Sequence, residues 1–78
     1  MNLVRDIKII EAILFASGEP VLIDDLKDKI INKDKFEIYI KEIKDFYLNR
    51  GIQLIKTGNK FTFITSPEIS DDLTIFKR

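Results

Sequence analysis

The sequence predicts a small α+β domain in which three helices precede a β-hairpin. Two spacings of the apolar residues predict this order: a repeat of three to four positions up to residue 47, and alternation of every second position between residues 52 and 64. The first spacing is typical of amphipathic helices and the second of half-buried strands. The pair Gly58-Asn59 separates the two alternating runs, as a tight hairpin turn requires.

The first predicted helix runs from about Leu3 to Ser17. At about 100° per residue, one inner stripe collects Leu3, Ile7, Ile10 and Leu14. Gly18 suits the left-handed position just past a helix end. Pro20 forces the residue before it into an extended conformation, so the helix cannot continue.

Residues 21–31 hold a short second helix, with Leu26 and Ile30 one turn apart on its inner face. No good capping residue precedes it, because Leu22 is apolar, and a missing cap costs about 1 kcal/mol. This helix therefore needs tertiary packing to hold it. Val21 is placed to pair with the hairpin edge as a third, very short strand.

The third helix starts with Asp34 and Glu37, a capping-box-like pair at N-cap and N3. Its inner stripe, with two flanking aromatics, consists of Phe36, Ile40, Ile43 and Tyr47, flanked by Tyr39 and Phe46. Gly51 is expected to end it as Gly18 ends the first. Only residues 32–33 separate it from the second helix, and a turn that short is typical of a helix-turn-helix pair.

A short last helix opens with Ser66 as N-cap and Pro67 at the first helical position. Ile69, Leu73 and Phe76 are spaced as one face of it. The complete order is that of a winged helix, with a three-helix core, a β-hairpin wing and a short C-terminal helix. We expect residues 1–78 to form a single winged-helix domain.

The composition argues against an enzyme. The chain contains no Cys and no His, which removes thiolate metal ligands and the commonest general base. Serines 17, 66 and 70 therefore lack a His or Cys partner that could activate them. The acidic pairs at 24–25 and 71–72 lie in or near predicted first turns of helices, where the helix dipole favours negative charge. The three glycines are isolated, so no phosphate-binding loop exists. We predict no catalytic, cofactor-binding or metal-binding site.

No apolar stretch approaches the roughly 20 residues that span a bilayer. The N-terminus also lacks the small-residue cleavage site of a signal peptide. We therefore expect a cytoplasmic protein with no membrane contact.

A DNA-binding winged-helix transcriptional regulator is the alternative, because the outer face of a third helix can enter the major groove. That face carries Glu37, Ile38, Lys41, Glu42 and Asp45. Three acids against one lysine repel phosphates, and the 13 basic and 13 acidic side chains of the chain cancel. Lys41 is better read as the i,i+4 partner of Glu37 and Asp45. Lys56 and Lys60 beside the wing turn are the remaining candidate phosphate contacts, and we expect no autonomous sequence-specific binding.

Protein–protein contact is the function class that remains. Outside its core stripe, the first helix carries Val4, Ile9, Ala12, Ile13, Phe15 and Ala16, and only Glu11 interrupts this belt in the second half. Periodicity leaves open whether the belt is covered by the small core or marks an interface. The candidate interface residues are Val4, Ile9, Ala12, Phe15 and Ala16. Ile38, alone among charges, is a second candidate contact with a partner.

Three segments resemble the N-terminal domain of the bacterial segregation and condensation protein B family: "IIEAILFASGEPV", "RGIQLIKTGNKFTFIT" and "SPE", in this order and spacing. The family's opening is similar to a Glu-Ala-Leu-Leu-Phe-Ala-Ser-Gly-Glu-Pro-Val run, which residues 11–21 match with Ile13 in place of one leucine. Arg50-Gly51 and Pro67-Glu68 match later landmarks. Leu22 departs from the family, which usually has a serine there.

The resemblance implies a non-catalytic accessory subunit of the bacterial condensin, acting in chromosome condensation and segregation. It implies a homodimer formed through this domain, and a complex with the kleisin subunit and, through it, with the condensin ATPase. It further implies a second winged-helix domain in the full-length protein and a cytoplasmic, nucleoid-associated location. On this basis the second apolar face of the first helix is expected to be a dimer interface.

Overall fold

The computed structural model describes residues 4–69. Its elements are α1 (Arg5–Ser17), β1 (Val21–Leu22), α2 (Ile23–Asp28), the 3-10 turn η1 (Lys33–Lys35), α3 (Phe36–Phe46), β2 (Ile52–Thr57), β3 (Lys60–Thr65) and the 3-10 turn η2 (Pro67–Ile69). Three helices with a small antiparallel sheet confirm the predicted α+β winged-helix fold. Leu3, Leu73 and Phe76, which the sequence places in the first and last helices, lie outside the described residues.

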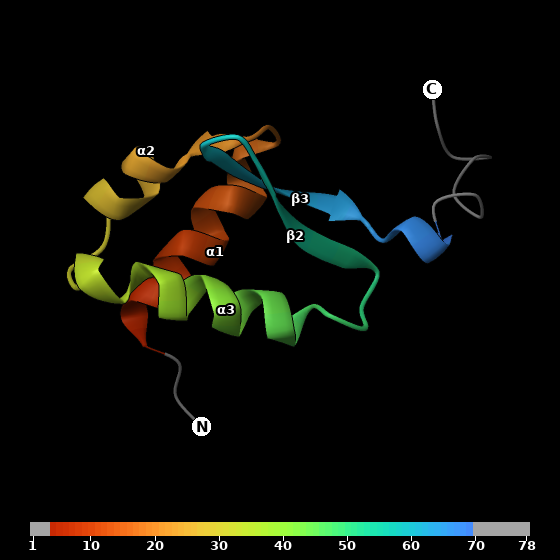
Figure 1. Cartoon of the computed structure of the whole chain (residues 1–78), viewed down its shortest axis with the longest axis horizontal. Helices are drawn as coiled ribbons and strands as arrows, with labels where there is room; N and C mark the ends of the chain where they lie inside the picture. Colours follow the sequence, from red (N-terminus) through yellow and green to blue (C-terminus); the bar gives the residue numbers. More distant parts are fainter. Residues whose placement is uncertain (1–3, 70–78) are drawn as a thin grey trace.

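The sheet has the strand order β1-β3-β2, and all its pairs are antiparallel. Val21 pairs with Phe61, so the very short third strand predicted from the sequence is present. Gly58 has φ +62°, and it is the first of the two loop residues between β2 and β3, as in a type II′ hairpin turn. The hairpin forms the wing above α3 (Figure 1).

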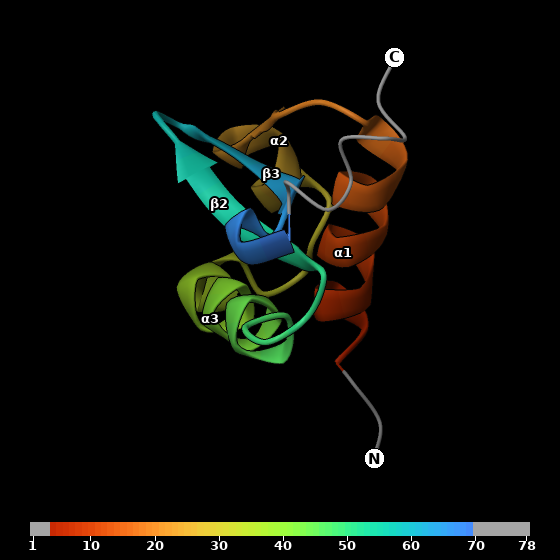
Figure 2. The same cartoon turned by 90° about the vertical axis from the view of Figure 1, so that its right-hand side faces the viewer.

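One core joins the three helices to the sheet. Its buried apolar side chains are Ile7, Ile10, Leu14, Leu26, Ile30, Phe36, Tyr39, Ile40, Ile43, Leu54 and Phe61. The predicted α1 stripe is therefore correct in its described part. In Figure 2, α1 lies at one edge of the molecule, with α2, α3 and the hairpin all on the same side of it. One flank of α1 is thus left without a covering element in the described part of the chain.

The flanking aromatics of α3 differ from the prediction. Tyr39 is 3% exposed and belongs to the core, whereas Phe46 is 59% exposed. Phe46 is the last residue of α3, where the core ends, and its ring packs edge-on against Tyr47 and beneath the Arg50 guanidinium. The side of the helix that is covered at its start is therefore open at its end.

The predicted capping box of α3 is wrong. Residues 33–35 form the 3-10 turn η1, so Lys35 occupies the N-cap position and makes no side-chain cap hydrogen bond. α2 ends at Asp28, which makes the connection to α3 longer than the two residues predicted and places Ile30 in a loop. Ile30 is nevertheless buried, as predicted.

Asp6 organises this connection. Its carboxylate accepts hydrogen bonds from the backbone N–H groups of Asn32 at 2.9 Å and Ile31 at 3.0 Å, and the side chain is 2% exposed. These two bonds favour the ionised form and hold the pKa of Asp6 below its usual value of 3.8. The Asp6 carboxylate thus accepts the backbone N–H groups of this loop, as the Asp34 side chain was expected to do at the start of α3.

Two further predicted helix ends have different outcomes. Gly18 adopts the left-handed conformation with φ +71° and ends α1 as predicted. Gly51 does not end α3, which stops at Phe46, and Gly51 has no positive φ. The turn after Phe46 closes instead through backbone bonds to Tyr47, whose N–H reaches the Ile43 carbonyl at 3.2 Å.

The start of α2 lacks a side-chain cap, as predicted. The hairpin supplies the missing acceptor, because the N–H of Ile23 donates to the Asn59 carbonyl at 2.8 Å. Pro67 begins a 3-10 turn after Ser66, and the Ser66 hydroxyl is buried without a hydrogen-bond partner in the described part of the chain. Ser66 therefore does not act there as the side-chain N-cap that the sequence predicts.

Candidate functional site

The uncovered flank of α1 carries most of the predicted self-association residues. Phe15 is 81% exposed and Val4 49% exposed, and Ala12 and Ala16 are also exposed. Ile9 is half-buried and packs against the core, together with Ile13. We call Val4, Ala12, Phe15 and Ala16 the α1 outer face. A phenylalanine this exposed on a regular helix presents apolar area that the described fold leaves in water.

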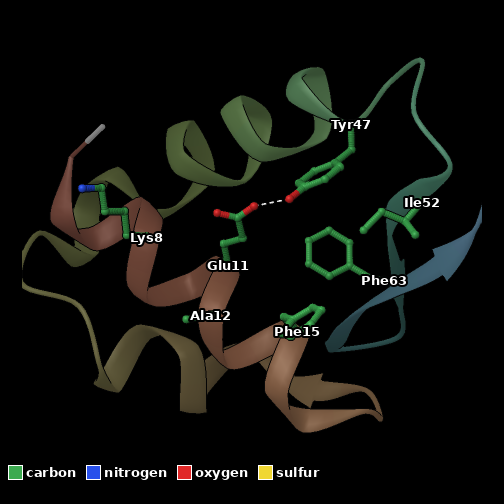
Figure 3. Close-up of a pocket in the computed structure, with 7 residues that line it drawn as sticks. All are labelled: Lys8, Glu11, Ala12, Phe15, Tyr47, Ile52 and Phe63. Carbon is green, nitrogen blue, oxygen red and sulfur yellow. Dashed lines mark hydrogen bonds between the residues drawn. The ribbon is translucent and has the colours of Figure 1, made fainter. Parts of the chain in front are cut away.

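A hollow of about 240 Å³ lies beside the α1 outer face, between α1 and the hairpin. Its lining consists of Lys8, Glu11, Ala12, Phe15, Tyr47, Ile52 and Phe63. In Figure 3, the first four come from α1, Tyr47 comes from the end of α3, and the last two come from the hairpin. We call it the α1–hairpin hollow; its walls are mostly apolar, with Lys8 and Glu11 as its two charged residues.

A hydrogen bond across the hollow fixes the side chain of Glu11. The Tyr47 hydroxyl donates to the Glu11 carboxylate (Figure 3). This bond, together with partial burial, raises the pKa of Tyr47 to about 12. The ring of Tyr47 packs against Phe63 with centroids 5.1 Å apart, so the hydroxyl is fixed in place. The one acid that interrupts the apolar belt of α1 is therefore paired with α3.

Sequence reasoning missed Tyr47, Ile52 and Phe63 as parts of this site. Glu11 and Tyr47 are 36 positions apart, and no local pattern links them. Tyr47 was assigned to the core stripe of α3, yet it is only half-buried. The alternation of the hairpin does not indicate that Ile52 and Phe63 border a hollow beside α1.

The outer face of α3 is acidic, as predicted. Glu37, Glu42 and Asp45 are exposed there, and Ile38 is 58% exposed among them. Lys41 forms an ion pair with Asp45 at 2.7 Å, and the expected second pair with Glu37 is not formed. The only lysine on this face is thus already neutralised.

Lys56 and Lys60 are exposed on the strands next to the wing turn. Each lies on a strand of the hairpin and not on α3. Two separate lysines give no continuous basic stripe that could follow a phosphate backbone.

Of the three serines, Ser17 has a structural role, Ser66 has a buried hydroxyl without a hydrogen-bond partner within residues 4–69, and Ser70 lies outside them. The Ser17 hydroxyl donates to the Glu19 carbonyl at 2.8 Å in the turn after α1, and Ser70 and the acidic pair 71–72 are not in the described part. Within that part, no three His, Cys, Asp or Glu residues gather where they could hold a metal ion. Among the described helices, none has the length and apolar character needed to cross a bilayer.

The model of the family "Segregation and condensation complex subunit ScpB" matches residues 8–77. The chain belongs to this family. It is 41% identical over 74 residues to segregation and condensation protein B of Clostridioides difficile, covering 86% of this chain and 41% of the relative. It is 38% identical over 72 residues to the protein of that name from Clostridium tetani, covering 88% of this chain and 38% of the relative. The chain thus spans about two fifths of the length of these relatives.

Solved structures agree with the ScpB assignment. The crystal structure of a dimer of the ScpB N-terminal domain complexed with a ScpA peptide superposes with a TM-score of 0.83 at 26% identity, covering 96% of this chain and 92% of that one. A conserved hypothetical protein from Chlorobium tepidum shares the fold, with a TM-score of 0.75 at 22% identity, over 92% of this chain and 48% of that one. The family resemblance seen in the sequence is confirmed.

Proposed function

We propose that this ScpB-family chain is a non-catalytic accessory subunit of the bacterial condensin, acting in chromosome condensation and segregation. Its partners are a second copy of itself and the kleisin subunit, through which it meets the condensin ATPase. The similar ScpB N-terminal domain was solved as a dimer with a ScpA peptide, which supports both partners. The corresponding location is the cytoplasm, on the nucleoid. We further propose that residues 1–78 are the first of two winged-helix domains, since the relatives are more than twice as long.

The single observation that carries self-association is the exposure of Phe15 on the α1 outer face. At 81% exposed, its ring is one of the most accessible large apolar side chains between residues 4 and 69. Ala12 and Ala16 stand one turn apart beside it and leave room for the helix of a second copy to approach closely. Val4 is also exposed, at the other end of α1. Ile9 contributes less, because the core already covers part of it.

Sedimentation equilibrium of Ala16→Glu tests this surface. Ala16 is exposed, so a glutamate there is solvated in the monomer and leaves the fold intact. In a dimer that packs α1 against α1, two carboxylates are buried near the symmetry axis and repel each other. We expect Ala16→Glu to be monomeric at concentrations where the parent is dimeric. A variant as dimeric as the parent overturns the assignment of the interface.

The kleisin contact is tested by mixing the chain with a ScpA protein from the same cell. Ile38 is a candidate contact, since it is 58% exposed and surrounded by charged residues on α3. We expect Ile38→Asp to weaken complex formation in size-exclusion chromatography while leaving the dimer unchanged. If ScpA binds both proteins equally, Ile38 is not part of the contact; if it binds neither, this chain lacks the kleisin site.

The alternative of a DNA-binding regulator gains no support from the geometry. The outer face of α3 exposes three acids, and its one lysine is paired with Asp45. A regulator requires duplex binding that weakens with added salt and with Lys56→Gln and Lys60→Gln. We expect no measurable duplex binding by the parent chain at low salt.

A further inference from the structure

The strand β2 forms a free edge of the sheet. The strand order β1-β3-β2 places a neighbouring strand on only one of its two sides. With six residues, β2 spans about 20 Å, whereas β1 at the opposite edge has two residues. β2 therefore offers a longer run of main chain to an added strand than β1 does.

The hydrogen-bonding phase of the hairpin shows which backbone groups of β2 face outward. The N–H of Ser66 donates at 2.8 Å to the carbonyl of Gly51, the residue before β2. Hydrogen-bonded pairs alternate with unbonded pairs in an antiparallel ladder, so the odd-numbered residues of β2 bond to β3. The N–H and C=O groups of Leu54 and Lys56 therefore point away from β3. Within residues 4–69, no other backbone group bonds to them.

The surroundings of this edge are basic. Lys56 is exposed and lies directly opposite Phe61 in the register of β3. The Lys44 ammonium of α3 lies 6.0 Å from the centre of the same ring. Because side chains directly opposite each other share one face of a sheet, both lysines flank the same face near the edge. Neither lysine forms an ion pair in the described part of the chain, where Lys41 and Asp45 form the pair that occurs.

We propose that an extended, acidic segment of the kleisin subunit adds to β2 as a fourth strand of the sheet. Its backbone bonds to the outward N–H and C=O groups of Leu54 and Lys56, and its carboxylates pair with Lys44 and Lys56. In this mode of recognition, main-chain bonds supply affinity and the flanking side chains supply specificity. The inference rests on the proposed kleisin partner, and it names the place and mode of a contact separate from Ile38.

Charge and position favour this occupant over the alternatives. A second copy of β2, with the sequence IQLIKT, brings another lysine to the edge and no acid. The second copy is also assigned to the α1 outer face, and in Figure 2 the wing turn that follows β2 points away from α1. A nucleic acid brings phosphates for the lysines but has no peptide groups that continue the ladder. An acidic peptide satisfies both the backbone groups and the lysines.

Amide hydrogen exchange measured by NMR tests the added strand, with a ScpA protein from the same cell as the partner. We expect exchange at the N–H groups of Leu54 and Lys56 to slow by at least about tenfold in the complex. The matched control is the N–H of Ile55, which bonds to β3 with or without the partner and is expected to change by less than about threefold.

Three outcomes of this experiment contradict the proposal. Binding of ScpA without slower exchange at Leu54 and Lys56 overturns the added strand and leaves the kleisin partnership intact. Slow exchange at these two groups that appears without ScpA and is lost on dilution assigns the edge to a second copy. No binding of ScpA at all overturns the added strand together with the proposed function.

The acidic character of the partner is tested by Lys56→Glu. We expect this variant to raise the Kd for ScpA by at least about tenfold, because the new carboxylate repels the segment. The control Lys60→Glu makes the same change at an exposed position of β3, which is paired on both sides, and is expected to raise the Kd by less than about threefold. Both positions are exposed, so both variants are expected to fold, as circular dichroism checks. Equal losses in the two variants, or no loss in Lys56→Glu, overturn the acidic partner.

Discussion

Phe15→Ala is the sharpest test of how this chain self-associates. A phenylalanine exposes about 200 Å² when fully accessible, so a ring that is 81% exposed offers about 160 Å² for burial. Truncation to alanine removes about 100 Å² of this, which at 25 cal/mol per Å² corresponds to about 2.5 kcal/mol per copy. A symmetric dimer carries the change twice, so the association free energy falls by about 5 kcal/mol if both rings are fully buried. This is a loss of more than a thousandfold in the dimer Kd, and half the burial still gives a loss of about sixtyfold.

Sedimentation velocity over a concentration series measures this change. The matched control is Ile38→Ala, which removes an apolar side chain of similar exposure from the outer face of α3. Far-UV circular dichroism checks that both variants keep the winged-helix fold, as expected for changes at exposed positions. A dimer Kd that changes less than fivefold in Phe15→Ala, or as much in the control, refutes the assignment of the α1 outer face.

Two predictions concern the fold that positions this surface. Leu26 is completely buried and is the buried residue of α2, the helix that lacks a side-chain cap. Leu26→Ala is therefore expected to lower the free energy of unfolding by about 3–4 kcal/mol and to lower Tm by more than about 10 °C in thermal unfolding. The control Leu48→Ala, at a 63% exposed position, should change the free energy of unfolding by less than about 0.5 kcal/mol. Asp6→Asn is expected to destabilise the protein at neutral pH, because the amide replaces one of the two carboxylate oxygens that accept the backbone N–H groups of Ile31 and Asn32 with an NH2 group. The pKa of Asp6 lies below 3.8 in the folded state, so its contribution is fully present above pH 3.8 and is lost as the pH falls through the folded-state value. Urea unfolding at stepped pH should therefore show the gap between parent and Asp6→Asn closing below pH 3.8, and a gap that stays constant with pH contradicts the role given to this carboxylate.

The local features that the sequence predicted correctly are each determined by residues adjacent in the chain. The hairpin turn needs only glycine at position 58 between two alternating runs, and the end of α1 needs only Gly18 followed by Pro20. The same local reasoning failed at Gly51 and at the Asp34–Glu37 pair. Residues 33–35 form a 3-10 turn before α3, and α3 stops at Phe46 with the Tyr47 N–H bonded to the Ile43 carbonyl, so neither predicted cap is used.

The run from Glu11 to Val21 identified the family from the sequence alone, because it is far more specific than the residues that end an ordinary helix. It did not identify the surface. The self-association set named from periodicity included Ile9, and only the packed fold shows that the core already covers part of this side chain.

The sequence by itself determined the order of the elements, the α1 stripe that forms the core and the membership of the ScpB family. These follow from periodicity, turn chemistry and a contiguous motif, all of which act over a few residues. The tertiary structure alone decided the contacts that span 25 to 36 positions: Asp6 with the loop before η1, and Glu11 with Tyr47. It also decided which flank of α1 stays open, because coverage depends on where distant elements pack, and no local pattern encodes that.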